Sequence, residues 1–221
     1  MDQDRILLDI ETQQDFFGPA GSCYSPQADK AATNVLRLFG WARINEIPVV
    51  STVLRVRQGE RSPLSGVPHC IDGSEGEQKM AGTLMATRVN LGLRNTTDLP
   101  MDIFERFQQV IFEKRDTDIF LHARLERMIT EMAPVTFIIC GAGLARGIVQ
   151  AAVGLRRRDF GVIVASDAVL DLGDPMAEMA CLRMEAKNVV FAPTREIVTC
   201  RLARRHIRFR RSRLLRRRAR A

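Results

Sequence analysis

Residues 135–147 read VTFIICGAGLARG: an apolar strand-like run, a glycine-rich turn, and the start of a segment with helical period. The same alternation extends in both directions along the chain. It predicts strands at 5–10, 48–53, 110–113, 135–140, 161–165 and 189–192. It predicts helices at 29–45, 101–107, 120–132, 144–156 and 176–186, with a less regular excursion over 57–109. Apolar strands that alternate with helices are typical of a mostly parallel sheet covered on both faces, so we expect a doubly wound, six-stranded, three-layer α/β/α fold.

The composition is that of a globular protein, because 46% of the 221 residues are apolar and 27% are charged. The net charge of +7 arises from one segment, since residues 201–221 hold eleven arginines and no acid. Residues 1–200 therefore carry 22 basic and 26 acidic side chains, a net charge of −4. We expect one folded domain over 1–198 and an unfolded arginine-rich tail over 199–221. The high overall charge does not make the folded domain a nucleic-acid binder.

The sequence also carries signals of cellular location. The N-terminus is acidic, and no apolar run reaches the ~18 residues that a membrane span needs. The five cysteines are an odd number and form no Cys-x-x-Cys pair, which favours reduced, buried thiols over a disulfide framework. We therefore expect a cytoplasmic protein without a membrane span.

Three segments that follow predicted strands carry candidate chemistry. They are residues 11–17, 114–116 and 141–147. Because ligands of such sheets bind at the carboxyl ends of the strands, an acid, a lysine and a helix N-terminus are expected to meet at one pocket. Each segment also has a simpler interpretation: Lys114 as a solvated loop lysine, Asp15 as a turn cap, and the glycines as a strand-to-helix turn.

Five motifs occur in a fixed order along the chain. They are ILLDIETQQDFF at 6–17, HCIDGSEG at 69–76, FEKRDTDIF at 112–120, the segment from Cys140 to Leu155, and VASDA at 164–168. Together they resemble the isochorismatase-like cysteine hydrolases, the superfamily that includes nicotinamidases and N-carbamoylsarcosine amidohydrolases. The resemblance covers about residues 5–198 and implies the same three-layer fold.

The resemblance implies a nucleophilic mechanism. In that family a cysteine at a helix N-terminus attacks the substrate, an aspartate takes its proton, a lysine supports the charged state, and backbone amides bind the oxyanion. The corresponding catalytic positions are Glu11, Lys114 and Gly147. The implied ligand-binding residues are Gln13, Asp15, His69, Ala142, Gly143 and Arg146.

The sequence departs from the family pattern at two of the three catalytic positions. Gly147 has no thiol, and Glu11 stands in place of an aspartate, so only Lys114 is intact. Cys140, Cys70 and Cys23 are the alternative thiols; a buried structural role is favoured for Cys140, and neither of the others matches the nucleophile position. The second strand lacks the Asp-x-His metal ligands of nicotinamidases, and His69 alone cannot hold a metal, so we predict no metal and no cofactor.

These departures predict a catalytically degenerate hydrolase that binds a small molecule or acts as a regulator. An anionic ligand is expected, because a bare helix N-terminus beside Lys114 and Arg146 favours negative charge. The alternative is an active hydrolase of a small amide or isochorismate-type substrate that uses Glu11 and Lys114 with water or a displaced cysteine. Because members of the family commonly associate, a homo-oligomer is a further expectation.

Two other interpretations concern the glycines and the tail. The pattern Gly141-x-Gly143-x-x-x-Gly147 resembles a loose dinucleotide fingerprint, but it lies on the fourth strand instead of the first. The tail predicts nonspecific contact with nucleic acid or an acidic protein, unless it has no role. The tail residues assigned to nucleic acid are Arg208, Arg210, Arg211, Arg213, Arg216, Arg217 and Arg218.

Overall fold

The computed structural model describes residues 5–199 except 101 and 134, and it has the predicted α/β architecture. The strands are β1 Arg5–Ile10, β2 Val49–Leu54, β3 Arg88–Asn90, β4 Gln109–Lys114, β5 Thr136–Ala142, β6 Gly161–Leu170 and β7 Val190–Ala192. They form one sheet in the order β3-β4-β2-β1-β5-β6-β7, and every pair is parallel. The order reverses at β1, so the carboxyl ends of β1 and β5 border the switch point where ligands of such folds bind, and β4 lies one strand further away, beyond β2.

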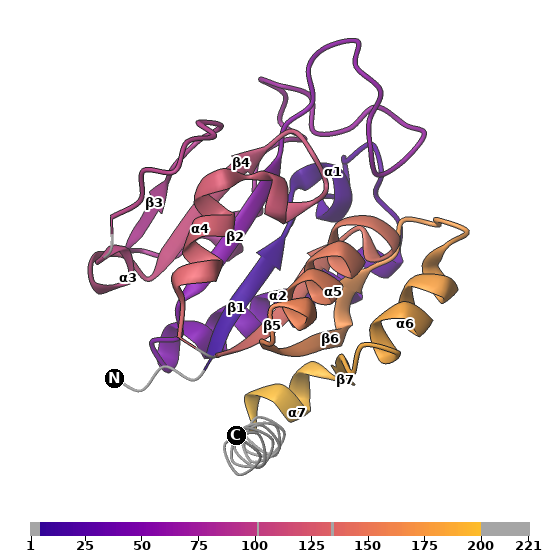
Figure 1. Ribbon diagram of the computed structural model, residues 1–221. Coiled ribbons are helices and arrows are strands. Elements are labelled where there is room, and N and C mark those ends of the chain that lie inside the picture. Colours follow the sequence, from indigo (N-terminus) through magenta and orange to yellow (C-terminus); the bar gives the residue numbers. More distant parts are fainter. Residues whose placement is uncertain (1–4, 101, 134, 200–221) are drawn as a thin grey trace.

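Helices cover both faces of the sheet, as Figure 1 shows with α4 and α5 in front and α2 behind. The α-helices are α1 Gln14–Phe17, α2 Gln27–Ile44, α3 Ile103–Arg106, α4 Ala123–Glu131, α5 Val149–Arg157, α6 Ala177–Glu185 and α7 Thr194–Val198. Three shorter helical segments are η1 Ala81–Thr83, η2 Ile119–Leu121 and η3 Leu144–Ile148. Helices α3 to α6 bury apolar residues in one core cluster, and α1, α2 and α7 do so in the other.

The structure corrects the predicted strand count from six to seven. The additional strand, β3, pairs with β4 at the edge of the sheet, and its residues are exposed or half-buried. An edge strand of three residues with one apolar side chain carries no clear periodicity, so the sequence pattern does not reveal it. Strand β6 also continues past the predicted end at Ala165, through the polar residues Ser166 and Asp167, to Leu170.

The two helices that border the candidate site begin irregularly. The predicted helix 120–132 starts as the 3-10 turn η2 and becomes α-helical only at Ala123. The predicted helix 144–156 starts as the π-helical turn η3, and α5 follows it. Turns of the π type are uncommon and occur often at functional sites.

None of the helices in the described ranges is long and apolar enough to cross a membrane. The domain boundary predicted near 198 and the arginines of the tail fall at or beyond the end of the described residues, so both remain predictions.

Candidate active site

Glu11 follows the last residue of β1 and leaves the regular alternation of the strand. Ile6, Leu8 and Ile10 face the core cluster under α4 and α5, whereas Leu7 faces the cluster under α2. Continued alternation would place Glu11 on the α2 face with Leu7. Its φ of 48° lies instead in the left-handed region, where a glutamate is uncommon and strained. This turn brings the carboxylate to Lys114.

Glu11 and Lys114 form a buried ion pair. The Lys114 Nζ lies 2.7 Å from the Glu11 Oε1, and the two side chains are 3% and 0% exposed. Thr52 on β2 donates its hydroxyl hydrogen to the same Oε1 at 2.8 Å. Lys114 Nζ also donates to the carbonyl oxygens of Asp116, at 2.6 Å, and Thr117, at 3.2 Å. Because an ammonium group has three N–H donors, this set uses all of them.

The second carboxylate oxygen of Glu11 is directed at Gly147. This Oε2 is buried and has no hydrogen-bond partner among the described residues. A Cβ atom built on Gly147 would lie 3.0 Å from Oε2 and 3.4 Å from the Ile10 Cγ2. Glu11, Lys114 and Gly147 therefore meet at one point, and a carboxylate oxygen lies beside Gly147, which has no side chain.

The glycines of the turn have a structural role of their own. Gly141 has a φ of 122°, and a Cβ there would lie 1.8 Å from the Ile10 carbonyl oxygen, so only glycine fits. Gly143 has a φ of 82° and begins the π-helical turn; its carbonyl accepts hydrogen bonds from the amides of Arg146 and Ile148. Ala142, the last residue of β5, is buried against β6. The Arg146 and Ile148 amides are therefore already used within the turn.

Gln13 and Asp15 hold loops together. The Gln13 amide nitrogen donates to the carbonyls of Leu54 and Glu77, and its oxygen accepts from the Leu54 amide. The Asp15 carboxylate accepts from the backbone amides of Ser22 and Cys70. Both residues thus fasten the excursion over 57–109 to the end of β1. This geometry agrees with the simpler interpretation of Asp15 as a cap.

His69 and Arg146 make no described contact with the Glu11–Lys114 pair. His69 is fully buried, packs edge-on against Phe16, and donates a hydrogen bond from Nδ1 to the Val67 carbonyl oxygen. Burial lowers the pKa of His69, so its neutral form is favoured. Arg146 is 54% exposed and pairs with Asp174 at 2.9 Å.

The alternative thiols lie in surroundings that oppose ionisation. Cys70 is buried and has a left-handed φ of 55°, and burial together with the nearby Asp15 and Glu11 carboxylates raises the pKa of its thiol far above the usual range. Cys140 is fully buried on β5, where burial and Asp9 raise its pKa. Since the thiolate is the nucleophilic form, these surroundings disfavour both residues as nucleophiles.

A second buried ion pair, on the opposite face of the sheet, was not predicted. The Lys79 Nζ lies 2.5 Å from the Asp9 Oδ2 and also donates to the Thr12 hydroxyl at 2.7 Å. Ser51 donates its hydroxyl hydrogen to the same Asp9 oxygen at 2.7 Å. The pair thereby fixes Thr12, the residue next to Glu11. An aspartate inside an otherwise apolar strand was the signal that could have revealed it.

Across the described ranges, no group of three or more His, Cys, Asp or Glu side chains is arranged to hold a metal ion. The nearest candidates by sequence, His69 and Asp15, already bond to the Val67 carbonyl and to the backbone amides of Ser22 and Cys70.

The comparisons with known proteins agree with this architecture. Residues 95–196 match the isochorismatase domain. No curated protein is similar enough in sequence to count as a match. Among solved structures, an isochorismatase family protein from Desulfovibrio vulgaris is 19% identical, with a TM-score of 0.67, and the match covers 89% of this chain and 97% of that one.

Two functionally named structures are similar to nearly the same extent. The nicotinamidase/pyrazinamidase of Bacillus subtilis is 18% identical, with a TM-score of 0.65 over 86% of this chain and 99% of that one. The N-carbamoylsarcosine amidase of Thermoplasma acidophilum is 16% identical, with a TM-score of 0.63 over 86% and 96%. The architecture is a three-layer α/β/α fold of the isochorismatase-like kind. The match to the isochorismatase domain covers less than half of the chain, and these solved structures are less than 20% identical to it, so the likeness established is that of the fold.

Proposed function

We propose that this protein is a catalytically degenerate member of the superfamily that binds a small molecule at the Glu11–Lys114 pair. One observation carries the proposal: the position of the family nucleophile is Gly147, and Glu11 Oε2 lies 3.0 Å from where its Cβ would be. Without a thiol, no covalent intermediate can form there. Loss of such a nucleophile removes most of the rate enhancement of enzymes that depend on one.

The charge balance of the site favours a ligand that donates hydrogen bonds over an anion. Lys114 is neutralised by Glu11, and Arg146 is paired with Asp174. The group left to bind a ligand is Glu11 Oε2, an acceptor without a partner among the described residues. A buried acceptor is stabilised by an N–H or O–H donor and destabilised by a second negative charge. We therefore favour a primary amide or carbamoyl compound over the carboxylate or phosphate expected from the sequence.

Calorimetry with matched ligands tests both the binding and its chemistry. Nicotinamide and nicotinate differ mainly in exchanging an amide for a carboxylate, and methylurea, an uncharged carbamoyl compound, extends the test to a second amide. We expect the amides to bind and nicotinate to bind more weakly. A Glu11→Gln variant, which replaces the acceptor oxygen by an amide group, should lose the preference. Tighter binding of nicotinate than of nicotinamide would instead support an anion site. If none of these compounds bound, the result would contradict the proposed small-molecule site.

The same buried carboxylate supports a second candidate, an active hydrolase in which Glu11 is the general base for a water molecule. Its Oε2 is directed at Gly147 and accepts no hydrogen bond among the described residues, so this oxygen is free to take a proton from a water molecule placed there. This candidate predicts ammonia release from the same amides at ordinary enzyme rates, and a loss of about 100-fold or more in Glu11→Gln. Ammonia release at the background rate would exclude it.

A further inference from the structure

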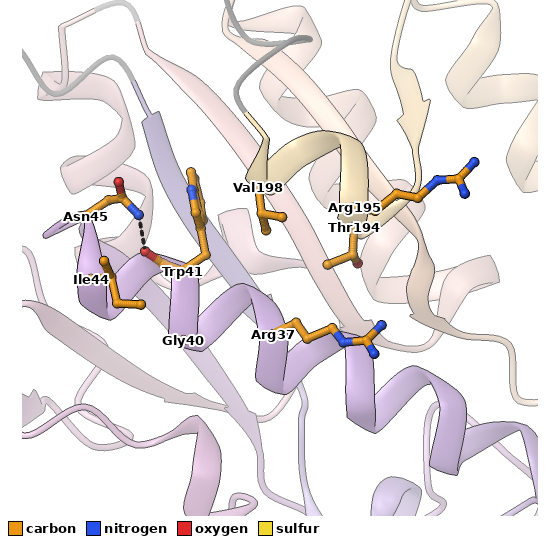
Figure 2. Close-up of a pocket in the computed structure, with 8 residues that line it drawn as sticks. All are labelled: Arg37, Gly40, Trp41, Ile44, Asn45, Thr194, Arg195 and Val198. Carbon is orange, nitrogen blue, oxygen red and sulfur yellow. Dashed lines mark hydrogen bonds between the residues drawn. The ribbon is translucent and has the colours of Figure 1, made fainter.

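A groove between α2 and α7 lies away from the Glu11–Lys114 pair. It has a volume of about 510 Å³, and its lining includes Arg37, Trp41, Ile44, Thr194, Arg195 and Val198. Figure 2 shows that the two ends of the groove differ in polarity. Trp41, Ile44 and Val198 form an apolar end, while the side chains of Arg37, from α2, and Arg195, from α7, both extend toward the other end.

The two arginines are available for an anion. Both are exposed, and no ion pair is found for either of them among the described residues. Arg37 donates only to the neutral Asn34 side chain, at 3.0 Å. A third guanidinium, that of Arg5, lies 6.0 Å from the centre of the Trp41 ring. The acids nearest in sequence are Asp29 and Glu46 for Arg37 and Glu196 for Arg195, and none of them lines the groove. The carboxylate of Asp167 lies behind the groove, where it accepts hydrogen bonds from the amide and hydroxyl of Thr194.

The apolar end offers an aromatic surface. Trp41 is half-buried, so part of its side chain is accessible, and Ile44 beside it is 83% exposed. A ligand with a flat apolar part and a negative part therefore matches the two ends. A nucleotide unit has this construction, because bases stack on aromatic side chains and phosphates bind guanidinium groups.

The most basic part of the sequence follows directly after the last residue that lines the groove. Val198 lines it, the description ends at Thr199, and eleven arginines with no acid follow between 201 and 221. Because Arg37 and Arg195 would repel these arginines, the tail is a poor occupant of the groove. The tail and the groove instead favour the same occupant, a polyanion long enough to reach both.

We propose that the groove between α2 and α7 is a binding site for single-stranded nucleic acid, with Trp41 stacking on a base and with Arg37 and Arg195 contacting phosphate. The tail arginines add sequence-independent contacts to the neighbouring phosphates. The site is independent of the proposed small-molecule function, since it uses no residue of the Glu11–Lys114 pair.

The tryptophan provides a direct test, because Trp41 is the only one in the chain. The full-length protein is titrated with a 20-nucleotide oligothymidylate, and both Trp41 fluorescence and the anisotropy of the labelled strand are followed. We expect saturable quenching that parallels the anisotropy. Poly-glutamate at equal charge should cause little quenching, which distinguishes nucleic acid from an acidic protein.

Two full-length variants locate the binding residues. In Arg37→Gln/Arg195→Gln the affinity should fall several-fold. The slope of log K against log salt should weaken by about 1.4, which is roughly 0.7 for each phosphate that the variant no longer neutralises. Arg183→Gln is the control, since it removes an exposed charge from α6 on another part of the surface. Three results would overturn the proposal. A rise in anisotropy without quenching of Trp41, or equal affinity of the two variants, would assign the binding to the tail alone. The absence of any binding would exclude a nucleic-acid site.

Discussion

The Glu11 carboxylate lies beside the backbone of Gly147, where its Oε2 would be 3.0 Å from a Cβ atom. Glutamate is one methylene longer than the aspartate that the family pattern has, and glycine is the residue without a side chain. Under the proposed function, the two departures are complementary in volume: the longer acid extends toward the space that a cysteine side chain at position 147 would occupy. A change at one position affects what fits at the other.

This complementarity predicts the outcome of restoring the family residues. In Gly147→Cys alone, the new Cβ and Sγ must displace the Glu11 carboxylate, and we expect a loss of about 1–3 kcal/mol in the free energy of unfolding. In Gly147→Cys with Glu11→Asp the shorter acid makes room, and aspartate tolerates a φ of 48° better than glutamate does. Urea unfolding should show recovery of stability in the double variant.

The same variants test degeneration directly. Ammonia release from nicotinamide and N-carbamoylsarcosine should appear only in the double variant. Glu11→Asp alone is the control, because it shortens the acid without supplying a thiol. Activity in the wild-type chain equal to that of the double variant would contradict the proposed loss of function.

The buried Glu11–Lys114 pair predicts an asymmetric response to mutation. Lys114→Met leaves the Glu11 carboxylate buried without its cation, which should cost about 3–5 kcal/mol of stability. Adding Glu11→Gln removes the uncompensated charge, so the double variant should be more stable than Lys114→Met alone. Chemical unfolding of both variants measures the difference. If the two substitutions were additive, the pair would not be coupled as the 2.7 Å distance requires.

The meeting of Glu11 and Lys114 could be predicted from the sequence because Glu11 follows β1 and Lys114 is the last residue of β4. Ile10 and Lys114 end β1 and β4, and the carboxyl ends of parallel strands meet at one edge, so the meeting point could be predicted without coordinates. Sequence alone could not show that a left-handed residue turns Glu11 to the other face of the sheet. That conformation depends on the neighbouring contacts of Thr12 and Gln13, which are long-range.

The Asp9–Lys79 pair shows what could not be predicted. Its members are 70 residues apart, and the part of the excursion around Lys79 has no helical or strand period. Periodicity assigns residues to faces of elements, but it does not position a loop. The edge strand β3 lies in the same excursion and could not be predicted for the same reason.

The surroundings of the cysteines predict a pattern of alkylation. Cys70 and Cys140 are buried with raised thiol pKa values, whereas Cys23 is only partly buried. At pH 8, iodoacetamide should therefore modify Cys23 in the native protein and leave Cys70 and Cys140 unmodified until urea is added. Mass spectrometry of the digested protein measures each site. Rapid modification of Cys70 in the native state would instead support the hypothesis that Cys70 acts as a displaced nucleophile.

The buried histidines predict a loss of stability in mild acid. Burial lowers the pKa of both His69 and His122 from the ordinary value of 6.5, and both ring nitrogens of His122 have no hydrogen-bond partner among the described residues. The unfolded chain therefore binds protons more readily than the folded one below pH 6.5. Stability is fully present above that pH and falls as the pH drops toward the lowered pKa values.

The expected slope is at most about 1.4 kcal/mol per pH unit for each histidine. Urea unfolding followed by Trp41 fluorescence at pH 7.5, 6.5 and 5.5 measures it, in a range above the ordinary pKa values of exposed carboxyl groups. His69→Met and His122→Met should each flatten the curve between pH 6.5 and 5.5, and the double variant should flatten it most. An unchanged slope in the double variant would mean that other groups cause the acid sensitivity, because the variant leaves neither buried imidazole to take up a proton.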